Sequence, residues 1–277
     1  HHHILFFTNQ GRVFRIKGYE IPEASRTSRG TALVNLLSLQ ENEKVTATLC
    51  LRDTNEEKYL ILTTKKGIIK KTELIQFANV RKNGMIAITL NEGDQLIEAK
   101  VLSEKEDIFL VTRKGMAIQF NEEDIRATGR SSMGVRGIRL NQGDEVIGMQ
   151  KSSQGELFLL VSEKGYGKLT DKSSFKAQAR GGKGIRCYKI TDKTGDLVGF
   201  KLCDKDREIL LITTEGIMIR FNLDKVSILG RNTSGVKLMD IDKDSDTVIA
   251  SVAKVREESA EEEEEAEKQD EETSEEK

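Results

Sequence analysis

Histidine is almost absent from this 277-residue chain, since its three copies are His1, His2 and His3. Such a cluster at one end is typical of a tag remnant or a linker end rather than of a metal site. The rest of the chain lacks imidazole, which is the commonest general base near neutral pH and the commonest metal ligand. We therefore expect no catalytic residue and no metal site, and we do not expect the chain to be an enzyme on its own.

Cysteines, long apolar runs and aromatic residues are also scarce. Cys50, Cys187 and Cys203 are far apart and show no CxxC spacing, which argues against a disulfide framework or a zinc site and favours a reducing cytoplasm. No apolar run approaches the roughly 20 residues of a membrane span, so no membrane partner is expected. Tryptophan is absent and aromatic residues make up 5% of the chain, which argues against stacking of single-stranded bases.

Charge is unevenly distributed along the chain. Residues 257–277 hold 13 acidic and 2 basic residues, and removing them from the totals of 46 and 44 leaves 33 acidic and 42 basic residues in 1–256, a net charge of +9. The acidic block has too few apolar residues to form a core, so we predict a disordered acidic tail at 257–277. The preceding body is cationic.

Five segments of the body share one pattern, in which an apolar run meets a polar turn that ends in glycine and then a second alternating run. This pattern predicts a β-hairpin. The turn glycines are Gly11, Gly67, Gly115, Gly165 and Gly216, spaced 56, 48, 50 and 51 residues apart. The hairpin segments are ILFFTNQGRVFRI, YLILTTKKGIIKKT, IFLVTRKGMAIQF, LFLLVSEKGYGKLT and ILLITTEGIMIRF.

A second element follows each hairpin, with a basic residue three to four positions before a glycine and then a strand. Its copies are RTSRGTALVNLLSL, RKNGMIAITL, RSSMGVRGIRL, QARGGKGIRCYKI and RNTSGVKLMDI. Most repeats then close with an acidic turn and one more strand. Four strands per unit predict an all-β, propeller-like fold of radial four-stranded blades. The expected blades cover about 4–57, 58–105, 106–153, 154–205 and 206–256.

The loop before the glycine is basic in every repeat and contains no acidic residue. In a ring of blades, corresponding positions fall on one circumference, so these loops are expected to form a cationic belt that contacts the phosphates of bent duplex DNA. The paired positions are Arg26 and Arg29, Arg81 and Lys82, Arg130 and Arg136, Arg180 and Lys183, and Arg231 and Lys237.

The glycine-rich stretch at 181–184 does not have the spacing of a nucleotide-binding P-loop. Two interpretations remain open: a turn that needs positive φ at Gly181 and Gly182, or a bare backbone that a phosphodiester strand can approach while Arg180 and Lys183 contact its oxygens. Other basic residues lie in or just after the hairpin turns, where we expect solvated side chains. They are Lys65, Lys66, Lys70, Lys71, Arg113, Lys114 and Lys168.

Taken together, the hairpins and the stretches GRVFRIKGYEIPEASRTSRG, GRSSMGVRGIRL and GRNTSGVKL resemble the C-terminal domain of the DNA gyrase A subunit, a type IIA topoisomerase. The resemblance covers residues 4–256. It implies a β-pinwheel whose basic outer rim wraps duplex DNA and so supports ATP-dependent negative supercoiling. It also implies a bacterial, cytoplasmic and nucleoid-associated protein that works with the rest of the gyrase A protein and the gyrase B protein in a heterotetramer.

The same resemblance implies that catalysis, ATP and Mg²⁺ belong to other parts of that assembly, so no cofactor is expected in this chain. The family carries a box of the form Q-basic-basic-G-G-basic-G in its first blade. Here Gln178, Arg180, Gly181, Gly182, Lys183 and Gly184 match the box, while Ala179 departs from it. Because this copy lies in the fourth repeat, we expect the first blade, with the principal box, to precede His1.

Two alternatives stay open. The C-terminal domain of the topoisomerase IV A subunit shares the fold, with a degenerate or absent box, and would target DNA or partners in decatenation. A non-catalytic propeller that binds proteins, with incidental charge, is the other. The intact RGGKG run favours gyrase.

Overall fold

The computed structural model describes residues 2–25, 28–52, 58–103, 105–241 and 246–255. Arg26 and the acidic block at 257–277 lie outside these residues. Within them the chain is built of strands and short 3₁₀ segments, and no described helix is long and apolar enough to cross a membrane. The 3₁₀ segments are η1 (Gly18–Glu20), η2 (Leu33–Asn35), η3 (Leu74–Phe77), η4 (Glu122–Asp124), η5 (Ser152–Gln154), η6 (Lys172–Ser174) and η7 (Leu223–Lys225).

Five antiparallel hairpins form the framework, as the repeat predicted. They are β1 (His3–Thr8) with β2 (Arg12–Lys17), β4 (Tyr59–Thr64) with β5 (Ile68–Glu73), β8 (Asp107–Thr112) with β9 (Met116–Asn121), β12 (Leu157–Ser162) with β13 (Tyr166–Asp171), and β16 (Glu208–Thr213) with β17 (Met218–Asn222). All five turn glycines have φ between +76° and +84°, a conformation that glycine adopts without a steric penalty. The all-β, propeller-like fold is therefore confirmed.

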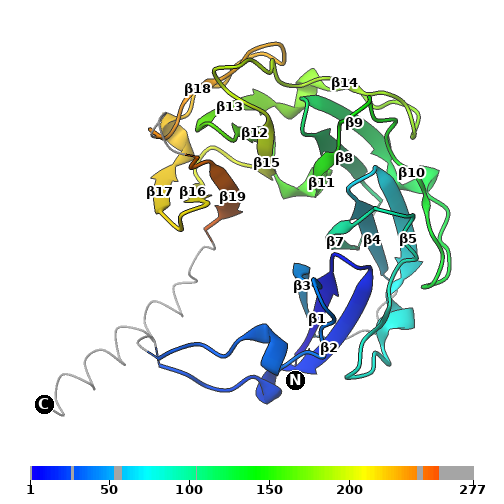
Figure 1. Cartoon of the computed structure of the whole chain (residues 1–277). Helices are drawn as coiled ribbons and strands as arrows, with labels where there is room; N and C mark the ends of the chain where they lie inside the picture. Colours follow the sequence, from blue (N-terminus) through cyan, green and yellow to red (C-terminus); the bar gives the residue numbers. More distant parts are fainter. Residues whose placement is uncertain (1, 26–27, 53–57, 104, 242–245, 256–277) are drawn as a thin grey trace, which may run out of the picture.

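Each hairpin gains an inner strand from the end of its own repeat. These strands are β3 (Val45–Leu51), β7 (Leu96–Leu102), β11 (Val146–Lys151), β15 (Leu197–Cys203) and β19 (Ile249–Lys254), each paired with the first strand of its hairpin. In Figure 1 the sheets follow one another around an open arc, with β7, β11, β15 and β19 on its inner side.

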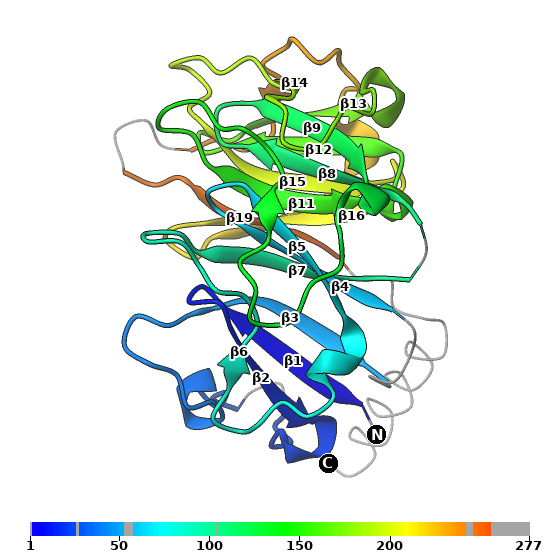
Figure 2. The ribbon, with the colours of Figure 1, turned by 90° about the vertical axis from the view of Figure 1, so that its right-hand side faces the viewer.

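The fourth strand of a sheet comes from the following repeat. The exchanged strands are β6 (Met85–Ile86), β10 (Val135–Arg136), β14 (Ile185–Arg186) and β18 (Val236–Lys237), and they pair with β2, β5, β9 and β13. Figure 1 places β10, β14 and β18 on the outer side of the arc, and Figure 2 shows β6 beside the first hairpin. Each of the first four sheets thus contains three strands of one sequence repeat and one short strand of the next repeat.

The carbonyl of the turn glycine holds each exchanged segment by hydrogen bonds. The carbonyl oxygen of Gly115 accepts hydrogen bonds from the amides of Cys187 (2.8 Å) and Tyr188 (3.3 Å), and the carbonyls of Gly11, Gly67 and Gly165 accept two amides each in the same way. Sheet β16–β17–β19 has three strands in the described part of the chain, because no later repeat there supplies a fourth. Its outer strand β17 leaves Met218 63% exposed.

Apolar side chains fill the spaces between neighbouring sheets. Phe158 of β12 is fully buried and stacks on Phe175 with ring centroids 4.1 Å apart, while Phe109 of the preceding sheet meets its edge at 5.1 Å. The sheets therefore bury their faces against one another, which fixes the outer loops of consecutive repeats in a regular order.

Candidate functional site

The exchanged strands and the loops that lead into them form the outer side of the arc. We call residues 80–86, 129–136, 178–186 and 230–237 the outer belt. The four segments come from successive repeats, and three of their strands are labelled on the outer side in Figure 1. Corresponding basic residues thus lie at corresponding places on adjoining sheets.

Several basic side chains of the outer belt face solvent. Arg81, Lys82, Arg136 and Lys183 are exposed, as is Arg29 of the first repeat. Lys237 is exposed as well, but its Nζ lies 2.5 Å from a carboxylate oxygen of Asp240. Lys82 forms a looser ion pair of 3.4 Å with Glu20. Of these exposed cations, Arg136 on β10 and Lys183 just before β14 have no ion-pair partner among the described residues.

In the last three segments of the outer belt, the first arginine is placed differently. Arg130, Arg180 and Arg231 are half-buried, and each donates a hydrogen bond to a main-chain carbonyl. The acceptors belong to the preceding repeat and are the carbonyl oxygens of Ile86, Arg136 and Arg186. Part of the donor capacity of these three side chains is thus used inside the protein.

The glycines of the box divide into two kinds. Gly181 and Gly184 have φ of +81° and +72°, and a Cβ on Gly184 would lie 2.4 Å from the carbonyl oxygen of Ala117. Gly182 has no positive φ, so the expected pair Gly181 and Gly182 is wrong in its second member. A Cβ on Gly182 would meet only ordinary contacts, the nearest at 3.4 Å. The fold therefore requires glycine at 181 and 184, and does not use the conformational freedom of Gly182.

Gln178 anchors the start of the box to the preceding sheet. The main-chain amide of Gln178 donates to the main-chain carbonyl of Gln119 at 2.7 Å, and the residue is half-buried. The amide of Gly181 donates to the carbonyl of Gly137 at 2.8 Å. The loop is therefore held at both ends by repeat 3, and it presents Lys183 outwards.

Three lysines near the hairpin turns contradict the expectation of solvated side chains. Lys70 and Lys168 are fully buried and Lys71 is 8% exposed. The Nζ of Lys168 donates to the carbonyls of Gly230 (2.7 Å) and Arg231 (2.9 Å), and Lys70 Nζ donates to Ala87 (2.7 Å) and to Arg130. For Lys70 and Lys168 the expectation fails because the exchanged loop of the next repeat supplies acceptors for the ammonium group. Lys71 instead forms an ion pair with Glu122 of η4.

Burial changes the acidity of these ammonium groups. Desolvation lowers the pKa of Lys70 to about 8, and the neighbouring Arg130 acts in the same direction. Desolvation likewise lowers the pKa of Lys168 to about 8. The two lysines stabilise loops of the outer belt from beneath and are not available to a ligand.

Basic residues at the hairpin turns themselves have carboxylate or carbonyl partners. Arg113 Nε lies 2.9 Å from Asp196 and Lys114 Nζ lies 2.8 Å from the same carboxylate. Lys65 pairs with Glu145 at 3.1 Å, and Lys66 Nζ donates to the carbonyl of Glu92 at 2.5 Å. Carboxylates thus lie beside Arg113, Lys114 and Lys65, so the turn region is less suited to a polyanion than the outer belt is.

Sequence interpretation missed three basic residues near the outer belt. Arg186 ends β14, and Arg139 and Lys189 follow β10 and β14 by three residues; all three are exposed. The signal was present in the repeat, because Arg136 and Arg186 occupy the same position after their glycines.

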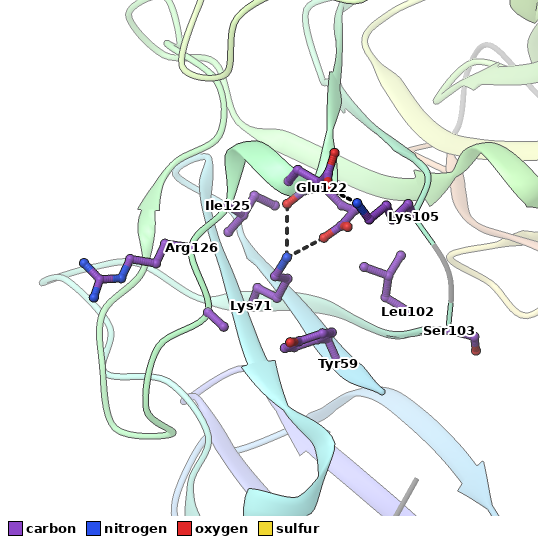
Figure 3. Close-up of a pocket in the computed structure, with 10 residues that line it drawn as sticks. Tyr59, Lys71, Leu102, Ser103, Lys105, Glu122, Ile125 and Arg126 are labelled. Atoms are coloured by element: carbon purple, nitrogen blue, oxygen red, sulfur yellow. Dashed lines mark hydrogen bonds and ion pairs between the residues drawn. The ribbon is translucent and has the colours of Figure 1, made fainter. Parts of the chain in front are cut away.

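A hollow of about 520 Å³ lies between the second and third sheets. Figure 3 shows Lys71 in it, directed at Glu122 and lying beside Tyr59. Lys71 forms an ion pair with Glu122, and its Nζ lies 4.8 Å from the Tyr59 ring centroid. Among the described residues, no group of three or more His, Cys, Asp or Glu side chains could hold a metal ion. The hollow offers a neutralised ion pair rather than a set of reactive groups.

Comparison with known proteins agrees with this architecture. The family profile of the DNA gyrase C-terminal domain, described as a beta-propeller, matches residues 2–52, 58–103, 106–153, 156–204 and 207–252. The DNA gyrase A protein of Clostridium acetobutylicum is 47% identical over 261 residues, which are 94% of this chain and 31% of the relative. The corresponding protein of Halalkalibacterium halodurans is 52% identical over 255 residues, 92% of this chain and 30% of the relative. The chain thus spans about a third of these curated relatives.

Solved structures show the same fold. A DNA gyrase A C-terminal domain superposes with a TM-score of 0.80 at 30% identity, covering 92% of this chain and 83% of that one. The C-terminal domain of a DNA topoisomerase IV superposes with a TM-score of 0.86 at 23% identity, covering 97% and 83%, a likeness that concerns the fold alone.

Proposed function

The chain belongs to the DNA gyrase C-terminal domain family, and from this membership we propose that its outer belt binds and bends duplex DNA as the DNA-wrapping part of a gyrase A protein. The observation that carries the proposal is the set of exposed cations at corresponding positions of successive sheets, among them Arg136, Lys183 and Arg186. They follow the convex side of the arc, where a curved phosphate backbone can contact several repeats.

The energetics favour distributed contacts of this kind. Bending 20–30 base pairs costs on the order of 1–6 kcal/mol, and neutralised phosphates release counterions that offset this cost. Recognition through phosphates needs little base readout, which suits arginine and lysine side chains on a rigid scaffold. The fold does not require glycine at position 182, and the absence of a side chain there supports close approach of a phosphodiester strand beside Lys183.

In the intact protein the wrapped DNA would be presented to a catalytic core elsewhere, so that strand passage introduces negative supercoils. On this proposal the chain itself is non-catalytic and binds no cofactor, while ATP and Mg²⁺ act in other parts of the assembly. Its partners are duplex DNA, the rest of the gyrase A protein and the gyrase B protein in a heterotetramer. The setting is the bacterial cytoplasm, in association with the nucleoid.

Salt dependence and bending test the proposal together. Binding of the chain to a duplex of about 40 base pairs should weaken steeply from about 50 to 200 mM salt. The double variant Lys183→Ala with Arg186→Ala should reduce the slope of log binding constant against log salt concentration by nearly two, because two phosphate contacts are lost. The double variant should also reduce ligase closure of short DNA fragments, whereas the control Lys65→Ala with Lys66→Ala should change it little. Affinity that stays flat with salt, or equal losses in both double variants, would overturn the proposal and favour a protein-binding propeller.

A further inference from the structure

The three half-buried arginines of the outer belt have one hydrogen-bonding geometry in common. Nη1 of Arg180 donates to the carbonyl oxygen of Arg136 at 2.6 Å, and Nη1 of Arg231 donates to that of Arg186 at 3.1 Å. Nη1 of Arg130 donates to the carbonyl oxygen of Ile86. In each case the acceptor is the second residue of the exchanged strand of the preceding repeat, so the contact recurs along the belt.

A main-chain hydrogen bond accompanies each arginine contact. The amide of Arg139 donates to the carbonyl of Gly182 at 2.8 Å, and the amides of Thr89 and Lys189 donate to Ser132 and Thr233 at 3.1 and 3.0 Å. Each of these three loops is therefore joined to the segment before it by both a side chain and the backbone. Together these contacts connect β6, β10, β14 and β18 into one continuous edge.

From this recurrence we infer that Arg130, Arg180 and Arg231 are positioning residues, which link consecutive repeats of the outer belt and do not themselves contact phosphate. Arg180 holds the carbonyl of Arg136, and Arg231 holds that of Arg186. Each of these two acceptors carries an exposed cationic side chain. The half-buried arginine of one repeat thus fixes the backbone beneath the phosphate-facing cation of the repeat before it.

The chemistry of guanidinium explains why the position is arginine. Arg180 donates from Nε to the carbonyl of Asp124 at 3.0 Å and from Nη1 to Arg136. A planar guanidinium donates from separate nitrogens in a fixed plane and so reaches two acceptors that lie apart, whereas all three donors of lysine leave one nitrogen at the end of a flexible chain. Lysine keeps the positive charge and could still contact phosphate, so Arg180→Lys separates the two roles.

Hydrogen exchange in the absence of DNA provides the first test. Arg180→Lys should speed exchange of the amides of residues 136–139 and 181–182 by about tenfold or more, since a hydrogen bond from a charged group is lost. The matched control Arg186→Lys, at an exposed position, should leave the same amides unchanged. Arg231→Lys repeats the test between the fourth and fifth repeats in case the Arg180 variant does not fold. If these amides exchange hydrogen at the wild-type rate in folded Arg180→Lys, the inference is wrong.

The second test uses DNA and rests on the proposed function. Arg180→Lys should reduce ligase closure of short DNA fragments, because the positions of the phosphate-contacting charges are less fixed. The salt dependence of DNA affinity should stay unchanged, because those charges remain. The control Arg126→Lys, at an exposed position outside the outer belt, should keep both ligase closure and the salt dependence. If Arg180→Lys retains full bending, the side chain acts through its charge and the inference is wrong. If the wild-type chain binds no DNA, the proposed function fails, while the exchange result still decides the inference.

Discussion

The ammonium nitrogen of Lys168 lies 2.7 Å from the carbonyl oxygen of Gly230, although the two residues are 62 positions apart in the chain. Arg231 and Thr233 supply further acceptors at 2.9 and 3.1 Å, so each N–H of the ammonium has a partner. Lys70, two repeats earlier, makes the equivalent contact with the carbonyl of Arg130 and a different one with the carbonyl of Ala87. A buried charge held by carbonyl groups therefore supports a loop of the outer belt from inside.

The stability of the protein should consequently depend on pH through Lys168. Its pKa is lowered by desolvation to about 8 in the folded chain, below its ordinary 10.5, so above pH 8 the unfolded chain holds more protons than the folded one. Lys168 should then add at most about 1.4 kcal/mol per pH unit to the free energy of unfolding between about pH 8 and 10, and its contribution should be flat at lower pH. Lys70, whose pKa is also lowered to about 8, adds a similar rise in both wild type and Lys168→Met. Urea unfolding of wild type and Lys168→Met at several pH values measures the difference.

Buried Cys187 acts in the opposite direction at higher pH. Desolvation raises its pKa to about 12, so it contributes stability that is lost as pH rises above its ordinary value of 9.0. This loss is common to wild type and Lys168→Met, and comparison of the two cancels most of it. Identical pH profiles for both proteins would contradict the assigned effect of Lys168.

Gly235→Ala should destabilise the exchange between the fourth and fifth repeats. Its φ is +74°, and a Cβ there would lie 2.4 Å from the carbonyl oxygen of Gly167, whose pairing with Val236 holds β18 on β13. We expect a loss of more than about 2 kcal/mol in the free energy of unfolding. Gly230→Ala is the matched control, because nothing lies within 4 Å of its added Cβ, and it should cost less than about 0.5 kcal/mol. Similar midpoints of denaturation for both variants would count against this geometry.

Phe158→Ala should remove a central contact between the third and fourth sheets. The ring is fully buried and meets Phe109, Phe175 and Phe200 with centroid distances of 5.1, 4.1 and 4.8 Å. Truncation should cost about 3–5 kcal/mol, and Phe158→Leu should cost less because it leaves a smaller cavity. Chemical denaturation measures both, and a Leu variant as unstable as the Ala variant would argue against cavity size as the cause.

Deletion of residues 257–277 should raise affinity for duplex DNA at low salt. The segment, which lies outside the described residues, carries a net charge of −11 and can compete with phosphates for the cationic body. The effect should fade towards higher salt, where such attraction is screened. Equal affinities of the full and shortened chains at low ionic strength would exclude competition by the tail.

The sequence by itself determined the hairpins and their number. The signal is local, since alternation and a turn glycine such as Gly115 lie within about a dozen residues, and the positive φ at that glycine follows from the turn. Repetition of the signal at nearly constant spacing then predicted sheets of one kind placed side by side. The same repetition placed the basic loops at corresponding positions, and their contact with DNA stays a prediction.

Which basic residues face outwards depends on contacts between distant parts of the chain. Lys168 and Lys183 both follow a glycine-containing turn or loop, yet one is fully buried and the other exposed. The difference arises from the strand exchange, which brings carbonyl groups 44 to 62 residues away onto Arg180 and Lys168. Charge and spacing cannot reveal such partners, because a lysine or arginine has the same local pattern whether its donors meet a backbone carbonyl or water.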